Sequence, residues 1–129
     1  VEACVEHGVP WVLDPVAAGF SPLRTDFAIE LLKLGGCAVL RGNGSEITAI
    51  AGASGGGKGV DSTRSSSAAL DSGCSLAHMY KCVVCISGAV DYVCDPDGRT
   101  FQCEHGDKML TKITAAGCLL SAIVAAFVA

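Results

Sequence analysis

The chain has 129 residues, enough for one ordinary domain with a sizeable hydrophobic core. Half of its residues are hydrophobic, 17% are charged and 16 are glycine, which is typical of a globular protein and not of a disordered one. Its net charge of -4, with nine scattered lysines and arginines, argues against a nucleic-acid-binding protein and against attachment to an anionic membrane.

The eight cysteines are too sparse for a small disulfide scaffold. Five of them lie in or beside apolar segments, as buried free thiols do: Cys4, Cys37, Cys82, Cys85 and Cys94. This usage favours a reducing compartment, so we expect a cytoplasmic protein.

A zinc site is a weaker alternative for the same cysteines. Cys82 and Cys85 have a C-x-x-C spacing, and Cys94 and Cys103 follow. However, residues 82–86 have the pattern of a buried strand, in which side chains three positions apart point to opposite faces. That arrangement is poor for one tetrahedral ion.

The two ends of the chain both resemble interrupted helices. Residues 1–7 read as the end of a helix that stops at Gly8, and the acidic Glu2 and Glu6 do not fit a signal peptide. The apolar run 113–129 is short for a membrane span and ends without a cap. We therefore expect residues 1–129 to be part of a larger domain.

The first expected strand, residues 9–13, ends at Asp14 and Pro15. A loop through Gly19 follows at the carboxyl end of the strand, where open α/β sheets bind their ligands. Asp14 is thus placed either to contact a ligand or metal ion, or to form a turn by bonding its own backbone.

Thr25 is the expected N-cap of the next helix, which ends at Gly35 and Gly36. Its expected buried face consists of apolar residues at helical spacing: Phe27, Ala28, Leu31 and Leu32.

The second expected strand, residues 38–40, delivers Arg41 to the same edge of the sheet. Asn43 and Glu46 have the spacing of a helix capping box. The alternative is functional, with Arg41 on a phosphate and Glu46 helping to hold a divalent cation. The local residues do not decide between these two interpretations of Glu46.

Gly52, Gly57 and Lys58 imitate a P-loop, but Gly59 stands where a P-loop has Ser or Thr, and the segment follows a helix. We interpret residues 55–67 as a mobile surface loop rich in glycine and serine. Residues 68–81 are expected to form the next helix, with Gly73 as a weak point and His78 on the surface.

The third expected strand, residues 82–86, leads to Ser87 at the same edge. Residues 90–94 and 99–103 flank a strong turn signal and predict a β-hairpin. The resulting order of helices and strands predicts an α/β fold, with a mostly parallel sheet flanked by helices.

The segment 108–118 ends in small residues, Thr114 to Gly117, which open a helix that we expect to be buried on most sides. The first amides of a helix have no partner within it and favour an anion. Cys118 lies in this first turn, where the helix dipole favours a thiolate. The simpler interpretation is a turn that leads into a core helix with one buried cysteine.

Three strand ends and one helix start therefore converge on one edge of the sheet. They bring together Asp14, Arg41, Glu46, Ser87 and Cys118. Carboxylates, a guanidinium and a helix N-terminus are the groups that phosphoryl transfer requires.

The chain resembles the hydroxyethylthiazole kinases, which are members of the ribokinase-like superfamily, over nearly its whole length. The motifs that carry the resemblance are Glu6-His7-Gly8-Val9-Pro10, Leu13-Asp14-Pro15-Val16 with Gly19, Pro22-Leu23-Arg24-Thr25, Arg41-Gly42-Asn43 with Glu46-Ile47, Lys58-Gly59-Val60-Asp61, Ile86-Ser87-Gly88-Ala89-Val90-Asp91, His105-Gly106, Met109-Leu110-Thr111-Lys112 and Gly117-Cys118. Each motif is weak alone, and their order together is highly specific.

The resemblance implies a homotrimeric enzyme that uses Mg²⁺ and transfers the γ-phosphate of ATP to 4-methyl-5-(2-hydroxyethyl)thiazole. It places Asp14 and Glu46 near the metal ion. It also places Arg41, Asn43 and Ser87 on the nucleotide, and Cys118 at the position of the catalytic base.

The resemblance further implies that the amides of residues 114–117 cradle the transferred phosphoryl group, with Thr114 and Gly117 on the nucleotide side and Ala115 on the substrate side. The family has glycine where this chain has Ala115. Alanine disfavours positive φ, so this turn is expected to cost about 1 kcal/mol or more. Other readings are a related small-alcohol kinase of the hydroxymethylpyrimidine type, or a non-catalytic homologue that acts in assembly.

Overall fold

The computed structural model describes residues 1–55 and 69–129. The interpretation of residues 55–67 as a surface loop, most of the P-loop-like segment and the Lys58–Asp61 motif lie outside these residues. The elements, in chain order, are α1 (Glu2–Glu6), β1 (Trp11–Leu13), α2 (Pro22–Lys33), β2 (Cys37–Asn43), α3 (Gly44–Ala53), α4 (Leu70–Tyr80), β3 (Val83–Ser87), β4 (Asp91–Cys94), β5 (Thr100–Cys103), a 3-10 helix (Lys108–Lys112) and α5 (Ala116–Val128).

The five strands form one sheet in the order β1-β2-β3-β4-β5. β1, β2 and β3 are parallel, with Leu13 beside Leu40 and Asn43 beside Ser87. β4 is antiparallel to both of its neighbours and forms the hairpin with β5. The predicted α/β class, the mostly parallel sheet and the hairpin are confirmed.

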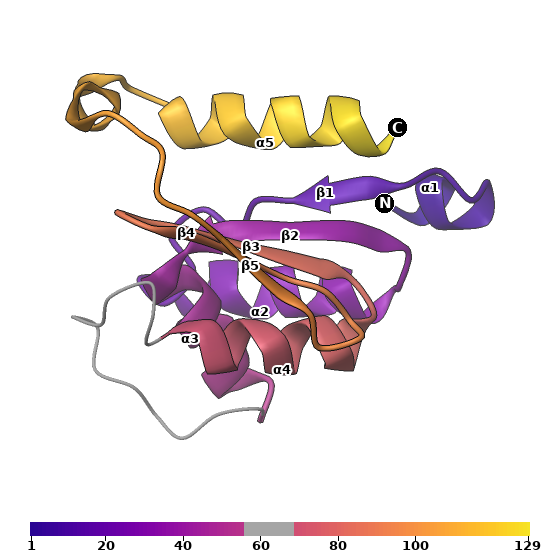
Figure 1. Ribbon diagram of the computed structural model, residues 1–129. Helices are drawn as coiled ribbons and strands as arrows, with labels where there is room; N and C mark the ends of the chain where they lie inside the picture. The colour runs from indigo at the N-terminus through magenta and orange to yellow at the C-terminus, as the bar shows by residue number, and fades with distance from the viewer. Residues whose placement is uncertain (56–68) are drawn as a thin grey trace.

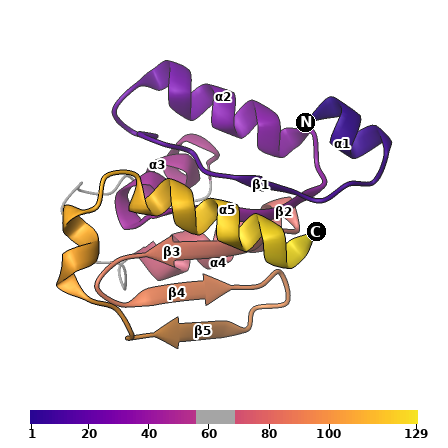
Figure 2. The same cartoon turned by 90° about the horizontal axis from the view of Figure 1, so that it is seen from above.

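The helices divide unequally between the two faces of the sheet. Figure 1 shows α2, α3 and α4 on one face and α5 alone on the other, and Figure 2 shows α5 crossing above the strands. The core lies on the three-helix side, and its fully buried large aliphatic side chains are Leu32, Leu40, Ile47, Ile50, Leu76, Val84 and Ile86. No residue of α5 is buried.

The predicted N-cap of α2 is wrong, and its predicted buried face is confirmed except at one residue. The helix begins after Ser21, with Pro22 at its first position, and Thr25 lies inside it. Pro fits the first turn because the amide that it lacks has no helical partner there. Thr25 is buried, and its hydroxyl donates to the carbonyl of Ser21. Of the predicted buried face, Ala28 and Leu32 are buried and Leu31 packs against the core, but Phe27 is 58% exposed.

The prediction that the last helix is buried on most sides is also wrong. Leu119 and Phe127 of α5 are 62% and 87% exposed. Gly73 lies within the continuous helix α4 at a point of close approach, since a Cβ there would lie 2.7 Å from Cδ1 of Ile86. His78 is on the surface, as predicted.

The cysteines are free thiols. Cys37, Cys82 and Cys94 are buried, whereas Cys4 and Cys85 are half-buried. Across residues 1–55 and 69–129, no helix is long and apolar enough to cross a membrane.

Candidate active site

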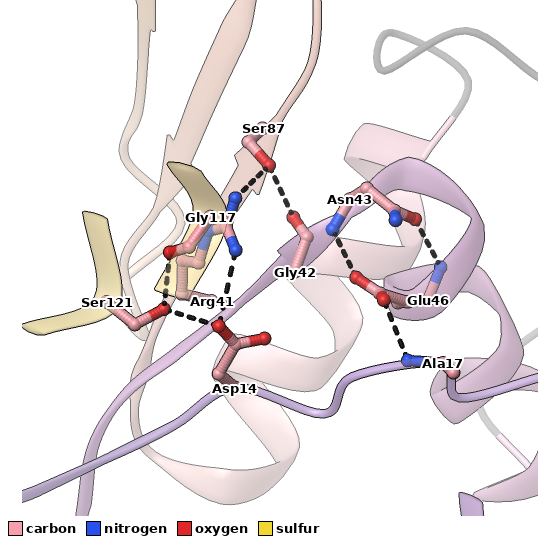
Figure 3. A network of polar contacts seen from close by, with 9 residues as sticks. All are labelled: Asp14, Ala17, Arg41, Gly42, Asn43, Glu46, Ser87, Gly117 and Ser121. Carbon is pink, nitrogen blue, oxygen red and sulfur yellow. Dashed lines mark hydrogen bonds and ion pairs between the residues drawn. The ribbon is translucent and has the colours of Figure 1, made fainter. Parts of the chain in front are cut away.

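The candidate site lies at the carboxyl ends of the parallel strands, where three of the predicted side chains converge. Asp14 directly follows β1, Arg41 lies near the end of β2 and Ser87 ends β3. The first turn of α5 lies against them from the other side (Figure 3). Parallel strands bring their carboxyl ends to one edge of the sheet, which explains this convergence.

Arg41 is the centre of the polar network. Its Nη1 lies 3.4 Å from Oδ2 of Asp14, and its Nη2 donates to Oγ of Ser87 at 2.7 Å. Ser87 in turn donates to the carbonyl of Gly42. The side chains of Arg41 and Asp14 are only 11% and 17% exposed, so water screens their ion pair less than it screens a surface pair.

The Arg41 guanidinium also lies against the first turn of α5. A Cβ on Gly117 would come within 2.7 Å of Nη1 of Arg41, so only glycine permits this approach. The start of a helix carries partial positive charge, and a guanidinium beside it is unfavourable without an anion. The Asp14 carboxylate supplies one such charge, and a bound phosphate would supply another.

One polar atom of this network has no partner. Nε of Arg41 is buried and, among the described residues, makes no hydrogen bond. An unsatisfied buried donor costs about 1–3 kcal/mol, and a catalytic role or a bound water or ion can account for such a donor.

The turn before α5 has the strained backbone that is predicted for Ala115, which stands where the family has glycine. Ala115 is the N-cap residue, with φ of 63° and ψ of 21°, in the left-handed region that favours glycine. Thr114, Ala115 and Cys118 are exposed, so Cys118 is not the buried cysteine of the simpler interpretation. In the part of the chain that the structure describes, the amides of Gly117 and Cys118 have no hydrogen-bond partner.

Glu46 has a clear structural role. It forms the capping box of α3, in which Asn43 Oδ1 accepts from the Glu46 amide and Glu46 Oε2 accepts from the Asn43 amide at 2.8 Å. Glu46 Oε1 accepts from the amide of Ala17 at 2.9 Å. The carboxylate therefore ties the loop after β1, where Ala17 has φ of 62°, to the start of α3.

A cavity of about 310 Å³ opens beside the capping box. Its walls come from the loop after β1, the start of α3 and the end of β3, and they include Phe20, Asn43, Glu46 and Ser87. Asn43 and Ser87, both predicted to contact a nucleotide, therefore face one cavity. Arg41 does not line this cavity but donates a hydrogen bond to Ser87, which does.

Metal ligation has a limited basis in the described residues. No group of three His, Cys, Asp or Glu side chains in residues 1–55 and 69–129 could hold a metal ion by itself. Mg²⁺ is commonly held by one or two carboxylates together with water and substrate phosphates. Of the two predicted ligands, Asp14 contacts Arg41 and Ser121, and Glu46 accepts the amides of Ala17 and Asn43.

Cys85, which is half-buried, and Cys94, which is buried, differ from Cys118 in their environment. Burial raises the pKa of the Cys85 thiol, although the nearby Arg41 guanidinium acts in the opposite direction. Burial, together with a hydrogen bond that its thiol donates to Cys74, raises the pKa of Cys94 to about 12. Buried thiols of this kind are poor nucleophiles, which leaves Cys118 as the exposed thiol next to the network.

Comparison with known proteins decides the family. The model of the hydroxyethylthiazole kinase family matches residues 1–129, the whole chain. The chain belongs to the hydroxyethylthiazole kinase family. The predicted resemblance is thereby confirmed, and the hydroxymethylpyrimidine type of kinase is not supported.

Comparison with individual hydroxyethylthiazole kinases shows how much of their length this chain covers. It is 44% identical to the enzyme of Tolumonas auensis over 129 residues, which are 100% of this chain and 48% of that protein. It is 48% identical to the enzyme of Clavibacter sepedonicus over 125 residues, or 97% of this chain and 45% of that protein. The chain thus spans about half the length of these relatives.

A solved hydroxyethylthiazole kinase from Pyrococcus horikoshii OT3 has the same fold. It superposes with a TM-score of 0.85 at 38% identity, over 98% of this chain and 46% of that one. The ribokinase-like arrangement that the resemblance implied is therefore confirmed at the level of the fold, for the part of the domain that this chain covers.

One member of the network was missed by sequence analysis. Ser121 of α5 donates to Asp14 Oδ2 at 2.6 Å, across 107 residues of sequence. A serine in an apolar helix has no distinctive pattern. Its position one turn after Gly117, on the same side of α5, is the only signal in the sequence that could have pointed to it.

Proposed function

We propose that the full-length protein transfers the γ-phosphoryl group of ATP to the primary alcohol of 4-methyl-5-(2-hydroxyethyl)thiazole. The observation that carries this proposal is the close approach of Arg41, paired with Asp14 and Ser87, to the first turn of α5. A guanidinium and free helix amides at one point provide positive charge where a phosphoryl group develops negative charge during transfer.

The roles of the residues follow from this geometry and from the family. Arg41, Asn43 and Ser87 would contact the nucleotide, and the backbone from Thr114 to Gly117 would hold the transferred phosphoryl group, with Ala115 nearest the substrate. Arg41 suits a phosphate because its planar guanidinium can bind one through two N–H groups, and among the described residues its Nε has no acceptor.

Asp14 and Glu46 would hold Mg²⁺ in the nucleotide-bound protein, directly or through water. Glu46 already accepts two backbone amides, one per oxygen, and each carboxylate oxygen can take a second partner. When bound, the ion would neutralise charge on the phosphates. Asp14 and Glu46 would orient the ion through their carboxylates, which hydrogen bonds already hold in place.

Cys118 would face the alcohol of the substrate. Its exposure and its place beside Gly117 put the thiol next to the helix amides, where it could accept the alcohol proton or orient the hydroxyl group. We further propose that the full-length protein is a cytoplasmic homotrimer, in keeping with its free thiols and its family.

The test is an ATP-dependent phosphorylation assay with the thiazole alcohol, on the full-length protein and its Cys118→Ala variant. We expect wild-type activity and a loss of several orders of magnitude in the variant. A Cys103→Ala variant is the matched control, because Cys103 is also an exposed free thiol but lies on β5. A wild-type protein without activity would refute the kinase and support a non-catalytic role in assembly.

A further inference from the structure

We propose that Ser121 is a positioning residue of the phosphoryl-transfer site, whose hydroxyl fixes the first turn of α5 to the pair formed by Asp14 and Arg41. This inference rests on the proposed function and adds a residue that the family motifs above do not include. Figure 3 shows the arrangement, with Ser121 and Gly117 on one side of Asp14 and Arg41.

The first argument is the direction of the Ser121 hydroxyl. Its Oγ lies 2.6 Å from Asp14 Oδ2 and 3.2 Å from the carbonyl oxygen of Gly117, one turn earlier in the same helix. A hydroxyl has a single proton. A distance of 2.6 Å is typical of an O–H group that donates to a carboxylate, so the proton is given to Asp14. A serine that only bonds back into its own helix would show the opposite order of distances.

The second argument is how little else holds α5. The helix packs mainly on β1 and β2, and no residue of it is buried. Among the described residues, the bond from Ser121 to Asp14 is the one side-chain hydrogen bond that joins α5 to another element. This hydrogen bond therefore adds a specific polar contact to the packing of α5 on β1 and β2.

The third argument is the close fit that α5 must keep. Gly117 lies one turn before Ser121, and a Cβ at Gly117 would approach Nη1 of Arg41 to 2.7 Å. A helix that moves along its axis by even one residue, about 1.5 Å, would change this contact and displace the first-turn amides from the guanidinium. Ser121 thus couples the anion-binding amides to the residues that face the nucleotide.

The experiment compares full-length wild-type protein with Ser121→Ala, Ser121→Thr and the control Ser75→Ala. Ser75 is an exposed serine within α4, far from the site in the fold. Steady-state kinetics with ATP and the thiazole alcohol would be combined with hydrogen exchange of the α5 amides. The exchange measurement needs no catalytic activity.

We expect Ser121→Ala to lower kcat about tenfold, with the KM for ATP changed less than threefold. Thr keeps the hydroxyl and should restore kcat to within threefold of wild type. The amides of residues 119–122 should exchange at least fivefold faster in Ser121→Ala, and at the wild-type rate in Ser75→Ala.

Three results would overturn the proposal: unchanged kcat and exchange in Ser121→Ala, equal losses in the Ala and Thr variants, or a loss of kcat that only follows a lower melting temperature. A wild-type protein without activity would instead refute the proposed function. Faster exchange in Ser121→Ala alone would then still support the attachment of α5 to Asp14.

Discussion

The two faces of the sheet are built in different ways. On one face, α2, α3 and α4 cover a core whose large aliphatic side chains are fully buried, including Leu40, Ile47 and Ile86. On the other face, α5 has no buried residue and is held by a polar network through Asp14 and Arg41. Within residues 1–129, the first face holds the buried core and the second carries the polar groups of the site, so substitutions on the two faces should have different consequences.

The largest effect on stability should come from the core face. Ile47 is fully buried, whereas Ile123 on α5 is 46% exposed. In the 129-residue chain, Ile47→Ala should lower the free energy of unfolding by about 3 kcal/mol, because it removes buried methyl groups and leaves a cavity. Ile123→Ala should lower it by less than about 1 kcal/mol. Denaturant unfolding measures both, and equal losses would show that the two faces do not differ.

On the α5 face, Gly117→Ala should lower activity strongly and change stability little. The added Cβ would meet the terminal nitrogens of Arg41, which can swing away at little cost in stability. Arg41 would then lose its contacts with Asp14 and Ser87. In the full-length protein, we expect kcat/KM to fall about 100-fold while the melting temperature changes by less than about 3 °C.

Gly52→Ala is the matched control for this substitution, since a Cβ at Gly52 would meet no atom within 4 Å. It should leave activity unchanged. If Gly117→Ala is as active as the Gly52→Ala control, the proposed role of Arg41 in the site is wrong.

The smallest effect on stability should come from relieving the backbone strain in the turn before α5. Ala115 has φ of 63°, so Ala115→Gly removes strain and should raise the free energy of unfolding by up to about 1 kcal/mol, partly offset by the greater freedom of glycine in the unfolded chain. Ala122→Gly is the control, because Ala122 lies within α5 and glycine there should destabilise the helix by about 0.5–1 kcal/mol. Thermal unfolding of both variants checks the prediction. A destabilised Ala115→Gly variant would contradict it.

The sequence predicted the core face better than the α5 face, for physical reasons. Short apolar runs between turn signals located every strand of residues 1–55 and 69–129, including the hairpin, since burial and backbone turns are local signals. The predicted start of α2 at Thr25 is wrong because proline fits the first helical position, so that the helix begins at Pro22 after Ser21 and includes Thr25. The apolar composition of α5 predicted burial, but composition does not say which element covers a helix.

The candidate site was predictable in its location and only partly in its contacts. Strand ends place Asp14, Arg41 and Ser87 at one edge, and the structure brings these three side chains together. The capping box that Asn43 and Glu46 predict is confirmed, while their roles toward a nucleotide or metal ion stay predictions. The contact of Ser121 with Asp14 spans 107 residues and follows from packing that no local pattern encodes.

The most direct test of the central claim is the activity of an Arg41→Lys variant of the full-length protein with ATP and the thiazole alcohol. Lysine keeps the positive charge but cannot reach Asp14, Ser87 and a phosphate together as a planar guanidinium can. We predict a loss of at least about 100-fold in kcat/KM, with the melting temperature changed by less than about 5 °C. Wild-type kinetics in this variant would show that phosphoryl transfer does not depend on the guanidinium between β2 and α5, and would contradict the account.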